Sequence, residues 1–299
     1  SLGILFVYPE KIDHLQKTVA FESAGESPNK PAKVCVGAVG AGNFAGSTLF
    51  PALKKTSAQL LVIASAGGAS GNHLGKKFQF AKNTTDYKTL LQDDKVNTIL
   101  ITTQHNSHAK FVCESLLAGK HVFVEKPLAM NREELQQIED LHQKQPDLHI
   151  MVGFNRRFSP HAQKMKQLLE NRLSPLSMIM TVNAGQIPAG HWTQDHQRGG
   201  GRIIGEACHF IDLLMLIVGQ PIMSVFAMKV GSSADQVMED KMSIQLMFVD
   251  GSIGTIHYFA NGSKDLAKER LEVFSDGRVL QLDNFKRLTG FGFKSFKKM

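Results

Sequence analysis

The first half of the chain alternates short apolar runs with segments of helical periodicity. The apolar runs are continuous, as in strands that are buried on both faces of a sheet. They lie at residues 33–38, 60–64, 98–102, 122–124 and 149–153. Helical segments follow them at residues 44–53, 90–91 and 111–117, and after a capping box at residues 131–134. This alternation predicts an α/β domain with a parallel, doubly wound sheet over residues 33–153.

The second half changes to apolar positions with a period of two. Residues 242–248 show this alternation, and the dipeptides Asp250-Gly251 and Asp276-Gly277 each lie between two strand-like runs. Such alternation is typical of antiparallel strands with one buried face, and Asp-Gly favours tight hairpins. We therefore predict a second α/β domain with a mainly antiparallel sheet over residues 154–299. Residues 1–32, which end in a Ser/Pro/Gly cluster, are predicted to be a lead-in and linker.

A glycine-rich turn follows the first strand. Residues 40–45 have the spacing G-x-G-x-x-A and open a helical segment. In such a turn the first glycine permits the tight bend, the second lets a pyrophosphate approach the backbone, and the small last residue packs helix against strand. The helix N-terminus offers N–H groups and a positive dipole to phosphates. The turn predicts a dinucleotide site with contacts from Gly40, Gly42, Asn43, Phe44 and Ala45.

The end of the next strand bears on the choice between NAD and NADP. An acidic residue there would hold the ribose 2′-hydroxyl of NAD, but the chain has Ser65 and then a Gly/Ser/Ala stretch at residues 66–71. Because Lys76 and Lys77 follow, this segment could accept a 2′-phosphate, which slightly favours NADP. A flexible loop without a preference is the alternative.

The apolar run at residues 122–124 leads directly into Glu125, Lys126 and Pro127. This places the acid and the lysine at the carboxyl end of a strand, where ligands bind in open α/β sheets. Pro127 ends the ladder by removing a donor and fixing φ, so Lys126 is expected to be held in place. A solvated lysine at a strand end is the simpler alternative.

A triple-glycine loop in the second half runs into an apolar helix that carries three polar residues. Glu206, His209 and Asp212 are spaced by three and so lie near one face. A histidine between carboxylates suits a general base, although a histidine that only tethers the helix is the alternative. No further metal ligand is obvious, so we expect no metal. With Lys126 as a cation near the substrate oxygen, these residues predict hydride transfer between nicotinamide and a secondary alcohol.

Composition limits the other classes of function. The net charge is +7, but five cations and no acid lie in the last fourteen residues, which we expect to form a solvated tail. The rest of the chain is nearly neutral, so a nucleic acid partner is not expected. The three cysteines are far apart and are expected to be reduced thiols. No apolar run reaches the length of a membrane span and no signal peptide is evident, which predicts a cytoplasmic protein without a membrane partner.

From about Lys33 to Leu288 the sequence resembles the Gfo/Idh/MocA oxidoreductases. The resemblance rests on residues 40–45, 86–91, 102–108, 119–127, 153–158 and 199–212. It implies a Rossmann domain and an α/β domain with a large open sheet, through which members often form homo-oligomers. It implies NAD(P)-dependent chemistry on sugars, cyclitols or nucleotide sugars, a cis Lys126–Pro127 bond, and catalysis by Lys126 and His209. The further cofactor contacts that it implies are Ser65, Thr102, Thr103, Asn106, His108, Glu125 and Lys126.

Two features of the resemblance bear on partners and activity. The chain is most similar to a subgroup fused behind a zinc-type alcohol dehydrogenase domain, and its start at Ser1 fits a fragment of such a fusion. Members usually have an aspartate four residues before the catalytic histidine, where this chain has Gly205. Either Glu206 takes over as a catalytic residue or the chemistry is altered. A catalytically silent NAD(P)-binding sensor or partner module is therefore the alternative function.

Four residues are predicted to contact the substrate: Asn155, Arg157, Trp192 and Arg202. Trp192 is the only tryptophan, and its face suits a sugar, although core packing explains it equally well. Arg202, beside the glycine loop, could bind a phosphate or a carboxylate. A solvated loop arginine is the alternative there.

Overall fold

The computed structural model describes residues 17–21, 34–231 and 240–299. The described residues form two compact units, the first within residues 1–103, 110–124 and 136–151 and the second within residues 104–109, 125–135 and 152–299. Most of the predicted lead-in lies outside the described residues. Two segments from the first half of the chain belong to the second unit, so the continuous limits 33–153 and 154–299 stay predictions.

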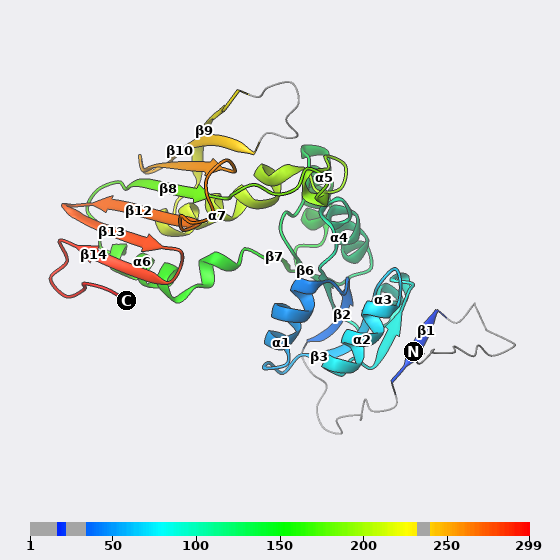
Figure 1. The fold of residues 1–299 in the computed structure, drawn as a ribbon. Coiled ribbons are helices and arrows are strands. Elements are labelled where there is room, and N and C mark those ends of the chain that lie inside the picture. Colours follow the sequence, from blue (N-terminus) through cyan, green and yellow to red (C-terminus); the bar gives the residue numbers. More distant parts are fainter. Residues whose placement is uncertain (1–16, 22–33, 232–239) are drawn as a thin grey trace, which may run out of the picture. The chain divides into compact units, whose positions relative to one another are not determined.

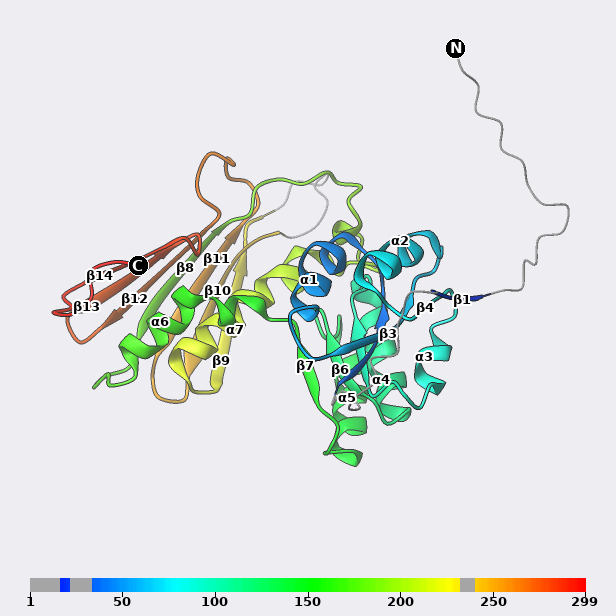
Figure 2. The ribbon, with the colours of Figure 1, turned by 90° about the horizontal axis from the view of Figure 1, so that it is seen from below.

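Within the described residues, the first unit contains a seven-stranded sheet in the order β1-β4-β3-β2-β5-β6-β7. The five neighbouring strands β4, β3, β2, β5 and β6 pair in parallel, and β1 pairs antiparallel with β4. Helices lie on both faces (Figures 1 and 2), which confirms the predicted doubly wound sheet. The strands are β1 (Thr18–Ala20), β2 (Cys35–Val39), β3 (Gln59–Ala64), β4 (Lys82–Thr84), β5 (Thr98–Ile101), β6 (His121–Val124) and β7 (Ile150–Val152).

Helices connect these strands. They are η1 (Ala45–Leu49), α1 (Phe50–Leu53), α2 (Ala69–Phe78), α3 (Lys88–Gln92), η2 (His105–Ser107), α4 (His108–Leu117) and α5 (Arg132–Lys144). The predicted capping box opens α5, because Asn131 Oδ1 accepts from the Glu134 N–H at 2.8 Å and Glu134 Oε2 accepts from the Met130 N–H at 2.8 Å. No described helix is long and apolar enough to cross a membrane.

The core of the first unit forms where α1 packs on the sheet. Phe50 is fully buried and meets Phe78 and Phe80 edge to face, with ring centroids 5.5 and 5.2 Å apart. Burying each such side chain stabilises the fold by about 1.5–3 kcal/mol. This packing fixes the helix that follows the glycine-rich turn.

The second unit contains another seven-stranded sheet among the described residues, in the order β14-β13-β12-β8-β11-β10-β9. Only β8 and β11 pair in parallel, which confirms the mainly antiparallel sheet. The strands are β8 (Ser177–Asn183), β9 (Ile222–Lys229), β10 (Lys241–Phe248), β11 (Ile253–Phe259), β12 (Glu269–Ser275), β13 (Arg278–Asp283) and β14 (Arg287–Phe291).

One face of this sheet is covered by α6 (Pro160–Leu169) and α7 (Cys208–Val218) (Figure 2). Three shorter helices are η3 (Asn155–Phe158), η4 (Trp192–Gln194) and η5 (Ile203–Ala207). Both predicted hairpins form, β10–β11 at Asp250-Gly251 and β12–β13 at Asp276-Gly277. Gly251 and Gly277 have φ of +84° and +72°, which favours glycine at these turns.

The basic C-terminal segment is not the solvated tail that the sequence suggested. Its backbone returns along β14, where the Leu288 N–H donates to the Met299 carbonyl and the Gly290 N–H to the Lys297 carbonyl, both at 2.8 Å. Phe293 and Phe296 pack against the core of the second unit. The aromatic residues between the lysines attach the segment to the fold.

Candidate active site

The glycine-rich turn of the first unit has the geometry that a dinucleotide requires. Gly40 has a φ of +106°, and a Cβ there would lie 2.8 Å from the backbone of Thr102, so only glycine fits. A Cβ at Gly42 would meet no atom within 4 Å, which leaves the backbone open to a ligand. Ala45 is buried between helix and strand, as predicted, and Thr102 Oγ1 donates to the Gly40 carbonyl at 3.1 Å. These residues therefore fit the phosphates of a dinucleotide.

The segment after β3 leads within a few residues into α2. Residues 69–71 already form the first turn of α2, and the Gly71 N–H donates to Ser65 Oγ at 3.1 Å. Lys76 and Lys77 lie in the last turn of this helix. At a rise of about 1.5 Å per residue they begin roughly 10 Å further along the axis than Ala69. This separation weakens the basis for expecting a 2′-phosphate.

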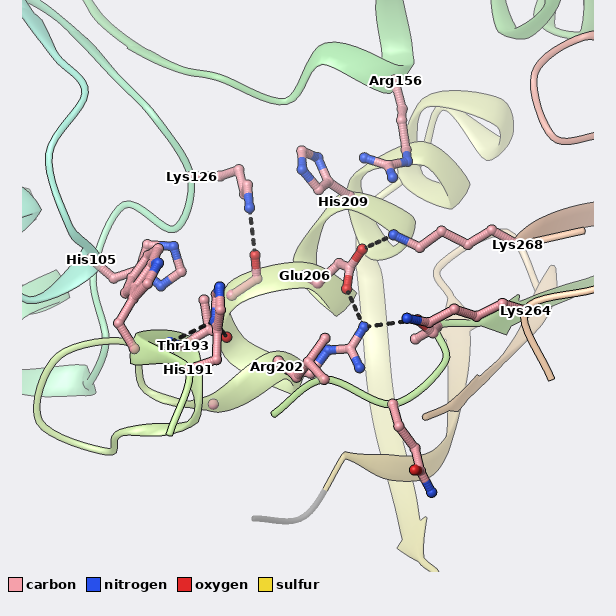
Figure 3. Close-up of a pocket in the computed structure, with 16 residues that line it drawn as sticks. His105, Lys126, Arg156, His191, Thr193, Arg202, Glu206, His209, Lys264 and Lys268 are labelled. Carbon is pink, nitrogen blue, oxygen red and sulfur yellow. Dashed lines mark hydrogen bonds and ion pairs between the residues drawn. The ribbon is translucent and has the colours of Figure 1, made fainter. Parts of the chain in front are cut away.

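Lys126 lies at the wall of a pocket of about 460 Å³ in the second unit (Figure 3). Its Nζ donates to the carbonyl of Gly205 at 2.7 Å, and its peptide bond to Pro127 is cis, as expected. The Pro127 carbonyl accepts from Nδ1 of the fully buried His108 at 2.7 Å. Lys126 is thus held by neutral groups and carries an ammonium into the pocket, so the solvated alternative is wrong.

Glu125 packs behind Lys126. A Cβ at Gly153 would lie 2.6 Å from Glu125 Oε1, so the glycine makes room for this carboxyl group. Burial raises the pKa of Glu125 to about 7, although the charge of Lys126 opposes the rise.

Asn106, from the same predicted set of cofactor contacts, donates its backbone N–H to the Arg198 carbonyl at 3.1 Å.

His209 lies in the first turn of α7 and lines the same pocket as Lys126. Burial lowers its pKa to about 3, and the charges of Arg156 and Lys126 lower it further. Its Nδ1 has no hydrogen-bond partner within the described part of the chain. The imidazole is therefore neutral near pH 7, and because Nδ1 is buried, a substrate proton could be taken up only at Nε2.

The carboxylates expected beside His209 serve other partners. Asp212 accepts two hydrogen bonds from the guanidinium group of Arg157, one from Nε at 2.9 Å and one from a terminal nitrogen. Glu206 accepts from Lys268, from the hydroxyl of Tyr258 and from Arg202. Burial alone would raise the pKa of Glu206, but the hydrogen bond and charge of Lys268, with its other donors, lower it to about 2. Glu206 therefore stays ionised, which argues against a role in proton transfer.

The predicted substrate contacts divide into two groups. Trp192 and Arg202 line the pocket, whereas Asn155 and Arg157 are not part of its lining. Arg202 is not a solvated loop residue: it is 7% exposed and donates to the Gly185 carbonyl at 2.6 Å. The pocket instead receives Arg156, whose Nε donates to Glu269 at 3.2 Å. Because neighbouring side chains of η3 point in different directions, Arg156 enters the pocket and Arg157 pairs with Asp212.

His105 is a pocket residue that sequence reasoning missed. It is 7% exposed, its Nδ1 lies 2.8 Å from the Gly199 carbonyl, and its ring meets Trp192 edge to face at 4.7 Å. Because a carbonyl can only accept, Nδ1 carries the proton and Nε2 carries the lone pair. Burial lowers the pKa of His105 to about 4, so this imidazole is also neutral near pH 7. No sequence signal links it to Gly205, one hundred residues away.

The His105 ring occupies the space that a side chain at position 205 would need. A Cβ at Gly205 would lie 2.7 Å from Cε1 of His105, whose ring is held by Gly199 and Trp192. We expect Gly205→Ala to destabilise the protein by about 1–3 kcal/mol, because the ring must move. Removing the ring in His105→Ala/Gly205→Ala should recover most of that loss in thermal unfolding. An equal cost of Gly205→Ala in both backgrounds would contradict this account of the contact.

Within the described residues, no group of three or more His, Cys, Asp or Glu side chains is placed to hold a metal ion. The three cysteines form no disulfide bond. Burial raises the pKa of Cys208, next to His209, to about 11, so it is not a thiolate near pH 7. The pocket presents imidazole, ammonium and guanidinium groups.

Comparison with known proteins places this site in a family. A family model described as "Oxidoreductase family, NAD-binding Rossmann fold" matches residues 34–154, and one described as "GFO/IDH/MocA C-terminal domain" matches residues 162–279. Myo-inositol 2-dehydrogenase of Thermotoga maritima is 28% identical over 222 residues, which cover 72% of this chain and 64% of that protein. An inositol 2-dehydrogenase/D-chiro-inositol 3-dehydrogenase of Lactiplantibacillus plantarum is 30% identical over 184 residues, which cover 60% and 50%.

Solved structures show the same fold at lower identity. Levoglucosan dehydrogenase in complex with NADH superposes with a TM-score of 0.77 at 21% identity, over 89% of this chain and 79% of that one. The WlbA dehydrogenase of Chromobacterium violaceum, in complex with NADH and UDP-GlcNAcA, gives 0.72 at 20% identity, over 85% and 75%. The two family models together match most of the chain, in the order in which its two sheets occur. The chain belongs to the Gfo/Idh/MocA family of oxidoreductases.

Proposed function

We propose that the protein is an NAD(P)-dependent oxidoreductase that transfers a hydride between nicotinamide and a secondary alcohol or ketone of a sugar, cyclitol or nucleotide sugar. The observation that carries the proposal is that the ammonium of Lys126 and the neutral imidazole of His209 line one pocket. The family of the first unit and the open backbone at Gly42 support the cofactor. Inositol and levoglucosan dehydrogenases among the similar proteins support the substrate class.

The roles of the pocket residues follow from the charges that oxidation of an alcohol creates. Bound nicotinamide would accept the hydride. Lys126 would stabilise negative charge on the substrate oxygen, because its ammonium is not neutralised by a carboxylate. His209 would take the hydroxyl proton at Nε2, since its imidazole is neutral and lines the pocket while its Nδ1 is buried. The lone pair on Nε2 of His105 would accept a hydrogen bond from a substrate hydroxyl.

The catalytically silent NAD(P)-binding module remains the second candidate function. It is favoured by Gly205, which provides no carboxylate four residues before His209. The two functions differ in one result: the silent module would bind cofactor but exchange no hydride with any sugar. The Lys126 ammonium in the pocket favours the enzyme, because a sensor needs no cation beside a neutral base.

The cofactor site predicts a substitution that is neutral for folding. Gly42→Ala places a methyl group where no protein atom lies within 4 Å, so thermal stability should not change. The same methyl group would occupy the space of the cofactor phosphates, and we expect the Kd for NADH to rise at least about tenfold. Titration of the fluorescence of bound NADH measures this effect. An unchanged Kd would contradict the assignment of the phosphate site to this turn.

The preference for NADP stays a prediction. A Cβ at Gly67 would meet no atom within 4 Å, so the segment could accept a 2′-phosphate, and no acidic residue ends β3. Lys76 and Lys77 lie in the last turn of α2, so they support a 2′-phosphate site less than their positions in the sequence suggested. Titrating the wild-type protein with NADPH beside NADH decides the preference.

We also propose that the protein forms homo-oligomers through the open sheet of the second unit. Met223, Val225, Phe226 and Met228 of the edge strand β9 are each more than 60% exposed, and such apolar patches are typical of interfaces. We expect Phe226→Asp to lower the mass measured by light scattering without lowering the unfolding temperature. A monomeric wild-type protein would contradict the proposal.

A linked zinc-type alcohol dehydrogenase domain and a cytoplasmic location also stay predictions. Neither matched family model describes an alcohol dehydrogenase domain. The complete reading frame of the gene tests the first prediction, and cell fractionation with an antibody tests the second.

A further inference from the structure

We propose that the substrate carries an acidic group, a carboxylate or a phosphate, which binds at the end of the pocket formed by Lys264, Lys268 and Arg202. The inference rests on the proposed function, because it concerns the substrate of the same pocket. It narrows the class of substrate from carbohydrates in general to acidic carbohydrates.

The charges of the pocket are strongly unbalanced. Among the described residues, five cationic side chains line it, whereas the only carboxylate in the lining is Glu206. The cations are Lys126, Arg156, Arg202, Lys264 and Lys268. Adding Glu269, which pairs with Arg156, leaves five positive charges against two negative ones, and Glu125 beside Lys126 is only partly ionised near pH 7 because burial raises its pKa to about 7. His105 and His209 do not change this balance, because their pKa values of about 4 and 3 leave both neutral near pH 7.

The pairing of the individual cations shows where the excess lies. Arg202 and Lys268 share the single carboxylate of Glu206, and Lys126 rests on the neutral carbonyl of Gly205. Lys264 has no ion pair among the described residues, and its stem passes over Gly185, where a Cβ would lie 3.1 Å from its Cγ. An anion bound at this end would therefore meet Lys264, which forms no ion pair within the described residues, and two cations, Arg202 and Lys268, that share one carboxylate.

The arrangement of the pocket suits a substrate with two different ends. Figure 3 shows Lys264 and Lys268 entering the pocket from one side and Lys126 and His105 lying on the other. Glu206 and His209 lie between the two groups. A sugar could place its reacting hydroxyl at Lys126 and His209 while its acidic group meets Lys264 and Lys268.

The cofactor phosphates have hydrogen-bond donors of their own. The N–H groups of the glycine-rich turn in the first unit already suit the cofactor phosphates. A neutral sugar would also leave the excess uncompensated, at the cost of the repulsion between cations in a partly buried site. An acidic substrate removes this repulsion and supplies affinity that a neutral one cannot.

An acidic substrate would also improve His209 as a base. The charges of Arg156, Lys126 and Lys268 all lower its pKa. A negative charge in the pocket offsets them and moves the pKa upward, towards the range in which an imidazole accepts a proton readily. The pocket geometry and this electrostatic effect point to the same ligand.

The test compares matched pairs of neutral and acidic sugars on the full chain saturated with NADH. Glucose with glucuronate tests a carboxylate, glucose with glucose 6-phosphate tests a phosphate, and UDP-glucose tests a diphosphate within a nucleotide sugar. Binding is followed by the fluorescence of bound NADH and by thermal shift. We expect at least one acidic sugar to bind about tenfold or more tightly than glucose, with an affinity that falls as salt rises. The acidic sugar that binds most tightly identifies the source of the charge.

Two variants separate this site from general attraction to a basic protein. Lys264→Gln should weaken binding of the acidic sugar about tenfold and leave the Kd for NADH unchanged. Lys166→Gln, at an exposed position of α6 outside the pocket, should change neither. Equal affinity for the neutral and acidic members of every pair, or equal effects of the two lysine variants, would overturn the inference. Turnover of neutral sugars with this result would leave the proposed function intact, whereas failure to bind both NADH and NADPH would remove the proposed function itself.

Discussion

Lys126→Met is expected to lower kcat by about 10³-fold while the Kd for NADH stays within a few fold of wild type. Methionine retains most of the length of the side chain and removes its charge. The loss arises in the transition state, because negative charge on the substrate oxygen would no longer face an ammonium. The hydrogen bond from Nζ to the Gly205 carbonyl is also lost, which we expect to cost about 1 kcal/mol of stability.

Two controls isolate the effect of the Lys126 charge. Lys166→Met removes an exposed lysine of the same unit and should leave kcat unchanged. Lys126→Arg keeps the charge but changes its geometry, so partial activity is expected. Turnover by Lys126→Met at the wild-type rate would exclude Lys126 from the reaction.

His209→Asn is expected to lower kcat/KM by about 10²–10⁴-fold, because the pocket loses its proton acceptor. The pH profile of the wild-type enzyme adds a second readout. A base is active above its pKa, and burial with the nearby cations holds the pKa of His209 at about 3 in the free enzyme. The kcat/KM for alcohol oxidation should therefore show no acid limb from this histidine between about pH 5 and 8.

Bound substrate changes the same titration. If an acidic group offsets the cations, the acid limb of kcat should lie at a higher pH than the acid limb of kcat/KM, since kcat reports the enzyme–substrate complex. His161→Asn, on α6 and outside the pocket lining, should alter neither profile. Full activity of His209→Asn would contradict the proposed base.

Local sequence signals predicted the fold, the glycine-rich turn and the position of Lys126. The G-x-G-x-x-A spacing, the apolar run before Lys126 and the two Asp-Gly turns each act over fewer than ten residues, so their structures could be inferred directly. Each of them depends on backbone geometry or on a single strand end. For such features the neighbouring residues carry nearly all the information.

Pairings over long distances in the chain could not be predicted in this way. Glu206 looked like an acid beside a base, but Tyr258 and Lys268, 52 and 62 residues away, engage it. The sequence alone does not show which of Arg156 and Arg157 enters the pocket. In the structure Arg156 lines the pocket and Arg157 pairs with Asp212. The contact of His105 with Gly205 and the return of the C-terminal segment along β14 have the same origin, because tertiary packing creates them.

The most direct test of the central claim is the reduction of NAD or NADP by the wild-type protein and by Lys126→Met. Both proteins are incubated with each cofactor and a panel of neutral sugars, cyclitols, uronates and nucleotide sugars, and the absorbance of the reduced nicotinamide is followed. The account predicts that wild type reduces the cofactor with at least one acidic member of the panel and that Lys126→Met does so at a rate about 10³-fold lower. Cofactor binding by wild type without reduction by any member of the panel would contradict it and identify a silent nucleotide-binding protein.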